Sequence, residues 1–178
     1  MRILKISVLI ITVALLMPIF ATALDKEPSD FNGIRWGSNR DRIAGLQYEY
    51  DDMTPYQQKT VFYSRKGDKK KLYGINVDDV LYEFYNDKFI MGRALASGED
   101  KFELLKANLV KKHGKWSKSE NNPTTFTDEK TKAPIKGTYE WYEWHGENIL
   151  IMLDYQTPKA AISLRMVSKK VCNKEGLR

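Results

Sequence analysis

The amino-acid sequence predicts an α+β fold, an antiparallel β-sheet with one short and one long helix packed on one face. Segments with the two-residue alternation of strands flank one long segment with helical periodicity, and short turn sequences join the strands. Helices that are segregated from antiparallel strands are typical of an α+β domain with one sheet face covered. Both halves follow the order helix, then strands, without sequence identity, so an internal repeat stays open.

The start of the chain has the three parts of a secretory signal peptide. Two basic residues precede an apolar run over residues 6–20, and Ala21 and Ala23 form an A-x-A cleavage site. The run is shorter than the about 20 residues of a spanning helix and contains Pro18, which argues against an uncleaved anchor. We therefore expect cleavage after Ala23, a periplasmic or secreted protein, and no integral membrane span after cleavage.

The remaining chain has the length of one domain, which we place at residues 24–168 with a polar tail at 169–178. Without Arg2 and Lys5, 27 basic residues face 23 acidic ones, a net charge of about +4. This excess favours weak attraction to anionic envelope polymers or lipid headgroups, and we predict no nucleic-acid partner for an exported protein. Cys172 is the only cysteine, so no internal disulfide can form, and its polar surroundings indicate an incidental thiol.

The first half of the domain predicts a short helix followed by strands. Ser38 can cap a helix of two turns that ends at Gly45. The segments QYEYDD and TVFYSRK are rich in aromatic and β-branched residues and predict two short strands on either side of a turn at Pro55. The longest strand signal, VDDVLYEFYNDKFIMGRALA, predicts a hairpin around a two-residue turn at Asn86 and Asp87.

The middle of the chain changes to a helical period. Phe102, Leu105 and Leu109 recur at helical spacing, with Ser97 as a possible N-cap and Gly114 as the end, and this pattern predicts the long helix.

The last third predicts more strands. Residues 116–137 are polar and contain two prolines, so we expect a long exposed connection, within which residues 124–127 could form a short strand. A hairpin at 138–155 and a strand at KAAISLRMVS follow, and we expect the tail from Lys169 to be frayed.

Several of these segments carry a resemblance. The signal-like start is followed by FNGIRWGSNRDRI, LYEFYNDKFI, FELLKANLVKKHGK and YEWHGENILIMLDY, with landmarks at Trp36-Gly37, His113-Gly114 and Trp144-x-Gly146. Over residues 31–155 this set resembles small exported proteins of unknown function from Gram-negative bacteria. The resemblance implies a periplasmic or envelope location and an α+β sheet, and it carries no assigned active site. The element order alone is similar to modules of secreted hydrolase inhibitors and outer-membrane assembly accessory domains, a fold-level analogy.

The sequence contains no motif of the common metal or nucleotide enzymes. His113 and His145 are its only histidines, and they lie far apart in sequence with the single cysteine elsewhere, so we predict no metal site. A nucleophile elbow and a glycine-rich phosphate loop are also missing from the sequence. We therefore predict no cofactor and assign no catalytic residue.

The stretch TYEWYEWHGENILIMLDY predicts the last hairpin, and its turn decides which residues face each other. With Gly146 and Glu147 in a type II′ turn, Trp144 pairs with Ile149. A turn one residue earlier would set Trp144 against Glu147 and deprive the apolar residues of apolar partners. The first register places one set of side chains in the core, namely Trp144, Tyr142, Ile149, Ile151 and Leu153.

The opposite face of this hairpin holds the candidate binding residues, which are Tyr139, Trp141, Glu143, His145 and Met152. Leu150 and Asp154 share the face. Cover by the short helix or by a second layer would make it part of the core, the commoner outcome for aromatic stripes. If exposed, an aromatic and methionine patch with charges around it is typical of a surface that binds a protein or glycan.

Three functions remain open on this basis. The first is a non-enzymatic envelope protein whose sheet face binds an envelope protein or polymer, as an inhibitor or accessory factor. The alternative is a hydrolase or lyase that acts on envelope polymers, which requires Glu143, His145 and Asp154 in one cleft with at least one of them buried. Ligand carriage, the third, requires an apolar cavity between sheet and helix.

Overall fold

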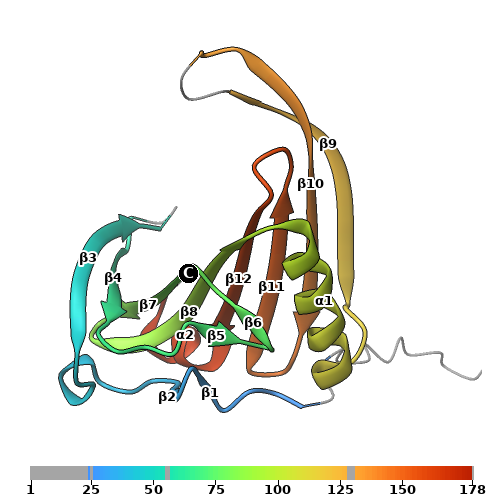
Figure 1. The fold of residues 1–178 in the computed structure, drawn as a ribbon. Coiled ribbons are helices and arrows are strands. Elements are labelled where there is room, and N and C mark those ends of the chain that lie inside the picture. Colours follow the sequence, from blue (N-terminus) through green and yellow to red (C-terminus); the bar gives the residue numbers. More distant parts are fainter. Residues whose placement is uncertain (1–23, 25, 55–56, 128–130, 178) are drawn as a thin grey trace, which may run out of the picture.

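The computed structural model describes Leu24 and residues 26–54, 57–127 and 131–177, so the predicted signal peptide lies outside the described residues. Eight strands form one antiparallel sheet in the order β3-β4-β7-β8-β12-β11-β10-β9 (Figure 1). β1 (Asp30–Phe31) pairs with β2 (Ile34–Arg35), and β5 (Lys71–Leu72) with β6 (Ile75–Asn76). The large sheet contains β3 (Leu46–Met53), β4 (Lys59–Arg65), β7 (Asp79–Tyr85), β8 (Lys88–Ser97), β9 (Lys118–Thr127), β10 (Pro134–His145), β11 (Ile149–Gln156) and β12 (Ala161–Ser168). The helices are η1 (Arg40–Arg42), α1 (Glu99–His113) and α2 (Lys169–Glu175).

The predicted antiparallel sheet with helices is therefore confirmed, and its strand order divides it into two halves. β3, β4, β7 and β8 follow one another across the sheet from one edge, and β9, β10, β11 and β12 do so from the other edge. The halves meet where the last strands of each, β8 and β12, pair antiparallel from Ala161 opposite Ser97 to Val167 opposite Met91. The strand order of the second half thus mirrors that of the first.

The long helix α1 covers one face of the sheet (Figure 1). Phe102, Leu105 and Leu109 are buried at the spacing that the sequence predicted, and the Phe102 ring stacks on Tyr155 with centroids 4.5 Å apart. Gly114 ends the helix as predicted, whereas Gly98 and not Ser97 is the N-cap residue. The Ser97 hydroxyl instead donates a hydrogen bond to Asp78.

The prediction of a short helix from Ser38 to Gly45 is wrong. Only a 3-10 turn forms, because the backbone before it pairs with the start of β8: Gly37 N donates to Phe89 O, and Phe89 N donates to Ser38 O. These bonds hold the segment extended along the β7–β8 hairpin, so it cannot form the predicted α-helix.

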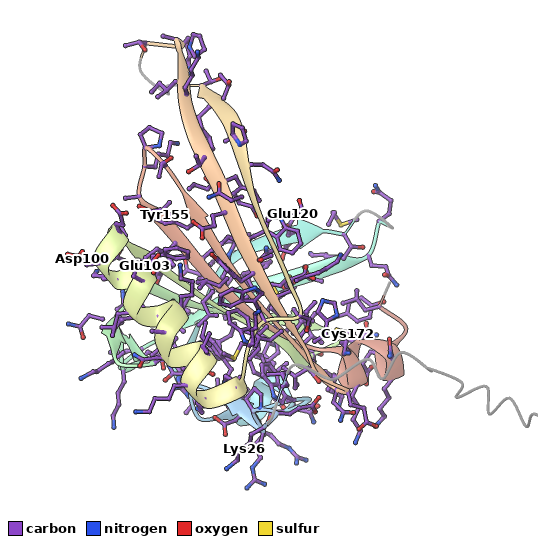
Figure 2. All side chains as sticks on the ribbon, turned by 90° about the vertical axis from the view of Figure 1, so that its right-hand side faces the viewer. Lys26, Asp100, Glu103, Glu120, Tyr155 and Cys172 are labelled. Carbon is purple, nitrogen blue, oxygen red and sulfur yellow. The ribbon has the colours of Figure 1, made fainter. Side chains whose placement is uncertain are left out.

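The prediction of a frayed tail is also wrong. α2 starts directly after β12, where the Ser168 hydroxyl accepts a hydrogen bond from Val171 N as a helix cap. Figure 2 shows α1 and Cys172 of α2 on opposite sides of the sheet. The predicted packing of one short and one long helix on one face is not confirmed, because the predicted short helix at 38–45 does not form and α2, which was predicted to be a frayed tail, lies across the sheet from α1. No helix among the described residues is long and apolar enough to span a membrane.

The predicted long connection at 116–137 is mostly regular structure. β9 pairs with β10 from Lys118 opposite Glu143 to Thr127 opposite Pro134, so the open possibility of a strand at 124–127 extends to ten residues. β9 is one of the two edge strands of the sheet, and nearly all of its residues are exposed. A strand that buries neither face has no apolar alternation, which is why the sequence pattern did not reveal it.

One predicted turn is confirmed and one register is wrong. Asn86 and Asp87 form the two-residue turn of the β7–β8 hairpin, and both have positive φ, as a type I′ turn requires. In the last hairpin, however, His145 pairs with Leu150 and not with Asn148. Each residue of β10 therefore faces a partner two positions further along β11 than predicted.

The N-terminal segment explains this loop. Leu24 is buried, and the Glu27 carboxylate accepts hydrogen bonds from the backbone and side-chain nitrogens of Asn148 at 2.8 and 3.0 Å. A Cβ on Gly146 would lie 2.2 Å from Glu27 Oε1 and 2.5 Å from a Leu24 methyl carbon. The glycine at this position thus serves a close contact with a distant segment, and the loop 146–148 is held by that contact.

Candidate binding face on the sheet

The face of the sheet opposite α1 carries the predicted site, and we call it the second face. A shift of two residues leaves the side-chain alternation unchanged, so the predicted assignment of residues to faces survives the wrong register. Trp144, Ile151 and Leu153 are completely buried on the α1 side, as predicted. Side chains on four adjacent strands make up the central part of the second face, namely Tyr139, Trp141, Glu143 and His145 on β10; Leu150, Met152 and Asp154 on β11; Ser163, Arg165 and Val167 on β12; and Met91, Arg93 and Leu95 on β8.

The second face is covered at one end and accessible at the other, so each of the two alternatives that the sequence left open holds for part of it. At its β4 and β7 end, near α2, the side chains of Thr60, Phe62 and Glu83 are buried. Over β10 to β12 most residues, including Trp141 and Met152, are only half-buried. This part of the second face is accessible, although its side chains pack against one another.

Four of the five predicted residues meet in a hollow of about 160 Å³. Its lining consists of Tyr139, Trp141, Tyr142, Glu143, Met152, Asp154 and Arg165. His145 lies outside the hollow at the end of β10, exposed, with Nε2 at 2.6 Å from Glu143 Oε2. The predicted site is thus brought together except for its histidine, and it gains Arg165 from β12.

A hydrogen-bonded chain runs from β10 through β11 to β12 in this hollow. The Tyr139 hydroxyl donates to Asp154 Oδ1 at 2.5 Å, and Arg165 donates to Asp154 Oδ2 at 2.8 Å. Burial and the hydrogen bond to the Asp154 carboxylate raise the pKa of Tyr139 to about 12. Both oxygens of the buried Asp154 therefore have a protein donor, and the three side chains hold one another in place.

Trp141 forms the outer wall of the hollow. It stands between Asp154 on β11 and Glu120 on β9 in the strand register, and the Lys118 ammonium lies 5.8 Å from its ring centroid. A cation at this distance from the ring adds a modest attraction. The indole is therefore half-buried and has a cation beside its ring.

Sequence reasoning missed the charged residues at the centre of the second face. Arg93 and Arg165 are direct partners across β8 and β12, and Glu83 lies one strand further on β7. Burial raises the pKa of Glu83, while a hydrogen bond from Thr60 opposes this shift. Alternation within each strand could have assigned these residues to a face, but only the pairing of β8 with β12 brings them beside the hollow.

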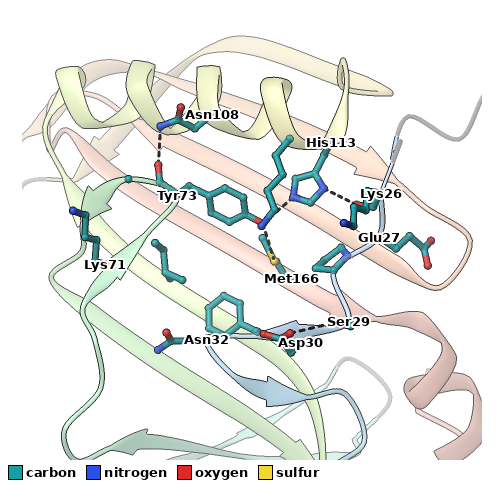
Figure 3. Close-up of a pocket in the computed structure, with 15 residues that line it drawn as sticks. Lys26, Glu27, Ser29, Asp30, Asn32, Lys71, Tyr73, Asn108, His113 and Met166 are labelled. Carbon is teal, nitrogen blue, oxygen red and sulfur yellow. Dashed lines mark hydrogen bonds between the residues drawn. The ribbon is translucent and has the colours of Figure 1, made fainter.

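A second, larger cavity of about 590 Å³ lies between the N-terminal segment, the β5–β6 hairpin and the C-terminal end of α1 (Figure 3). The completely buried His113 has Nδ1 at 2.8 Å from the Lys26 carbonyl and Nε2 at 2.8 Å from the Tyr73 hydroxyl. Because a carbonyl only accepts, Nδ1 carries a hydrogen, and in the neutral ring Nε2 accepts from Tyr73. Burial raises the pKa of Tyr73, which keeps its hydroxyl protonated. His113 therefore links the N-terminal segment to α1 and β5–β6.

This cavity does not have the character that ligand carriage requires. Its wall carries cationic Lys26, Lys71 and Lys112 and acidic Glu27 and Asp30, so it is polar and not an apolar space between sheet and helix. Among the residues that the structure describes, no group of three or more His, Cys, Asp or Glu side chains could hold a metal ion. The second face is the better candidate site.

Comparison of the chain with protein-family models, with curated proteins and with solved structures finds no match. The resemblance to small exported proteins of Gram-negative bacteria accordingly stays a prediction.

Proposed function

We propose that this chain is an exported periplasmic or envelope protein and that it acts as a non-enzymatic binding module through its second face. The observation that carries the proposal is the half-buried cluster of Tyr139, Trp141, Met152 and Arg165 in the middle of an accessible sheet face. Aromatic residues, methionine and arginine are the types enriched at the centres of protein interfaces. The rigid sheet presents them in a fixed arrangement, which lowers the entropy cost of binding.

Export is proposed from the order of charge, apolar run and A-x-A site at residues 1–23. N-terminal sequencing of the protein isolated from a periplasmic fraction tests it directly. We expect the chain to start at Leu24. A chain that retains residues 1–23, or that is found only in the cytoplasm, would refute this part of the proposal.

A hydrolase or lyase that acts on envelope polymers is the second candidate, and one observation favours it. Glu143 and Asp154 line the same hollow, and Asp154 is buried, as such a site would require. Against it, Asp154 already binds Tyr139 and Arg165 through both oxygens, and His145 lies outside the hollow. If the protein releases soluble fragments from purified envelope polymers, Glu143→Gln should abolish this release under the second candidate. Release that Glu143→Gln leaves unchanged would show that Glu143 does not catalyse it, as the first candidate expects.

Affinity capture from the envelope fraction of the producing cells tests the binding proposal. The protein starting at Leu24 is immobilised beside Trp141→Ala and beside a matched control, Leu104→Ala, which removes an exposed apolar side chain from α1 on the other side of the sheet. We expect one captured component that is retained by the wild type and by Leu104→Ala and lost with Trp141→Ala. Equal retention by all three proteins would refute the assignment of the second face.

A further inference from the structure

Two arginines face each other at the centre of the sheet. Arg93 on β8 and Arg165 on β12 are direct partners in the register that joins the two halves, and both side chains project from the second face. Like charges directly opposite on neighbouring strands are destabilising. Such a pair requires an anion nearby, either within the protein or from outside.

The described residues compensate the positive charge of this pair only in part. Arg165 forms an ion pair with Asp154 at 2.8 Å, yet its Nε is buried and has no hydrogen-bond partner in the described part of the chain. Arg93 makes a single long contact, from Nε to Ser163 Oγ at 3.5 Å, and forms no ion pair with any described residue. The two guanidinium groups thus retain unused N–H donors on the same face.

The acidic groups around the arginines do not fill this role. Each oxygen of Asp154 already accepts a hydrogen bond, one from Tyr139 and the other from Arg165. Glu83 is buried one strand away, where burial raises its pKa while a hydrogen bond with Thr60 and the charges of Arg93 and Arg165 lower it. Burial is the largest of these effects, and Glu83 forms no ion pair with either arginine. Arg93 therefore has no carboxylate as an ion-pair partner among the described residues.

We propose that the second face binds a partner protein through an aspartate or glutamate side chain that the partner inserts between Arg93 and Arg165. This inference rests on the proposed binding function and specifies its chemistry. The planar guanidinium groups offer paired N–H donors that match the two oxygens of a carboxylate. The inserted carboxylate would supply the negative charge between the two arginines and would accept hydrogen bonds from guanidinium N–H groups that no described residue binds.

The neighbours of the arginines fit a protein better than an anionic polymer. Apolar side chains surround the pair on the same face, namely Met91, Leu95, Met152 and Val167. A fully buried charge pair with an apolar surround is typical of the centre of a protein interface. The Asp154 carboxylate beside the pair would repel a doubly charged phosphate more than a singly charged carboxylate.

The test follows the Nε–H resonances of the arginines by NMR during titration with N-acetyl-aspartate amide, a single aspartate side chain without terminal charges. We expect saturable shifts at Arg93 and Arg165 and none at Arg42, which is exposed on the 3-10 turn. The matched probe N-acetyl-asparagine amide has the same shape without the charge and should give no saturable shift. Arg93→Gln should weaken binding of the aspartate probe about tenfold or more, the loss expected for hydrogen bonds to a charged group, whereas Arg42→Gln should not.

Several outcomes would overturn the inference. They are equal shifts with both probes, shifts at Arg42 as large as those at Arg93, no saturable shift at either central arginine, or tighter binding of inorganic phosphate than of the aspartate probe. Arg93→Lys keeps the positive charge but removes the guanidinium. A folded Arg93→Lys variant that binds the aspartate probe more weakly than the wild type would show that the guanidinium itself is required. If Trp141-dependent capture persists while the aspartate probe fails, only this inference is wrong. If both fail, the binding function is wrong as well.

Discussion

Trp144 and Trp141 lie three residues apart on β10, on opposite faces of the same sheet, and their surroundings differ completely. Trp144 is fully buried among the residues under α1, and its Nε1 donates to Gly114 O at 2.8 Å. Trp141 is half-buried, lies beside Lys118 and lines an open hollow. One strand thus supplies both a core residue and a candidate binding residue, because its two faces meet different partners.

The two faces also treat polar groups differently. On the α1 side, the polar groups form separate bonds: the indole of Trp144 donates to the Gly114 carbonyl, and the hydroxyl of Tyr142 donates to Glu140. On the second face, Tyr139, Asp154 and Arg165 form a polar chain across three strands. Substitution of Trp144 should therefore change mainly stability, and substitution of Trp141 mainly binding.

The largest expected difference is between the two tryptophans. Trp144→Ala should lower the free energy of unfolding by about 3–5 kcal/mol, because it leaves a large cavity in the core. Trp141→Ala should lower it by less than about 1 kcal/mol, as is usual for a partly exposed position. Urea denaturation followed by circular dichroism measures both free energies of unfolding. Similar losses for the two variants would contradict the assignment of Trp144 to the core and of Trp141 to an accessible face.

A smaller effect is expected for Tyr139→Phe on the second face. The change removes one donor from the buried Asp154 carboxylate, so we expect a loss of about 1–3 kcal/mol. Tyr48→Phe is the control, since Tyr48 is exposed on the outer strand β3 and should show no measurable loss. A Tyr139→Phe variant as stable as the wild type would show that the Tyr139 to Asp154 contact contributes nothing to folding.

The smallest expected effect is the pH dependence of stability that comes from Glu83, which is buried at the covered end of the second face. Its pKa is raised in the folded state, so the folded protein binds the proton more strongly than the unfolded chain. The stability that this group contributes is present below its ordinary pKa of 4.5 and decreases as the pH rises through the raised value. Glu83→Gln has no such dependence, so its stability relative to the wild type should rise with pH. Urea midpoints measured across this range check the sign, and a relative stability that falls with rising pH would contradict the burial of Glu83.

Much of the fold followed from local sequence signals. The helical spacing of Phe102, Leu105 and Leu109 predicted α1, and Asn86-Asp87 predicted the turn between β7 and β8. The two-residue alternation around Trp144 predicted which residues of β10 and β11 enter the core. These features depend on neighbouring residues, so the sequence alone contains them.

The features that the sequence did not predict depend on distant contacts. The loop at Gly146 is shaped by Leu24 and Glu27, more than a hundred positions earlier, and this contact shifts the register by two residues. Arg93 and Arg165 come together only because β8 pairs with β12. For the same reason, the candidate site was predicted on one hairpin, whereas the structure extends it over four strands.

The most direct test of the central claim, that the second face and not the α1 side binds a partner, is site-specific photocrosslinking in the producing cells. Benzoylphenylalanine replaces His145, which is exposed on the second face beside the hollow, in one variant, and Leu104, which is exposed on α1, in the other. We expect a discrete crosslinked adduct at position 145 and none at position 104. An adduct at position 104 alone, equal adducts at both positions, or no adduct at position 145 would contradict the assignment of the second face.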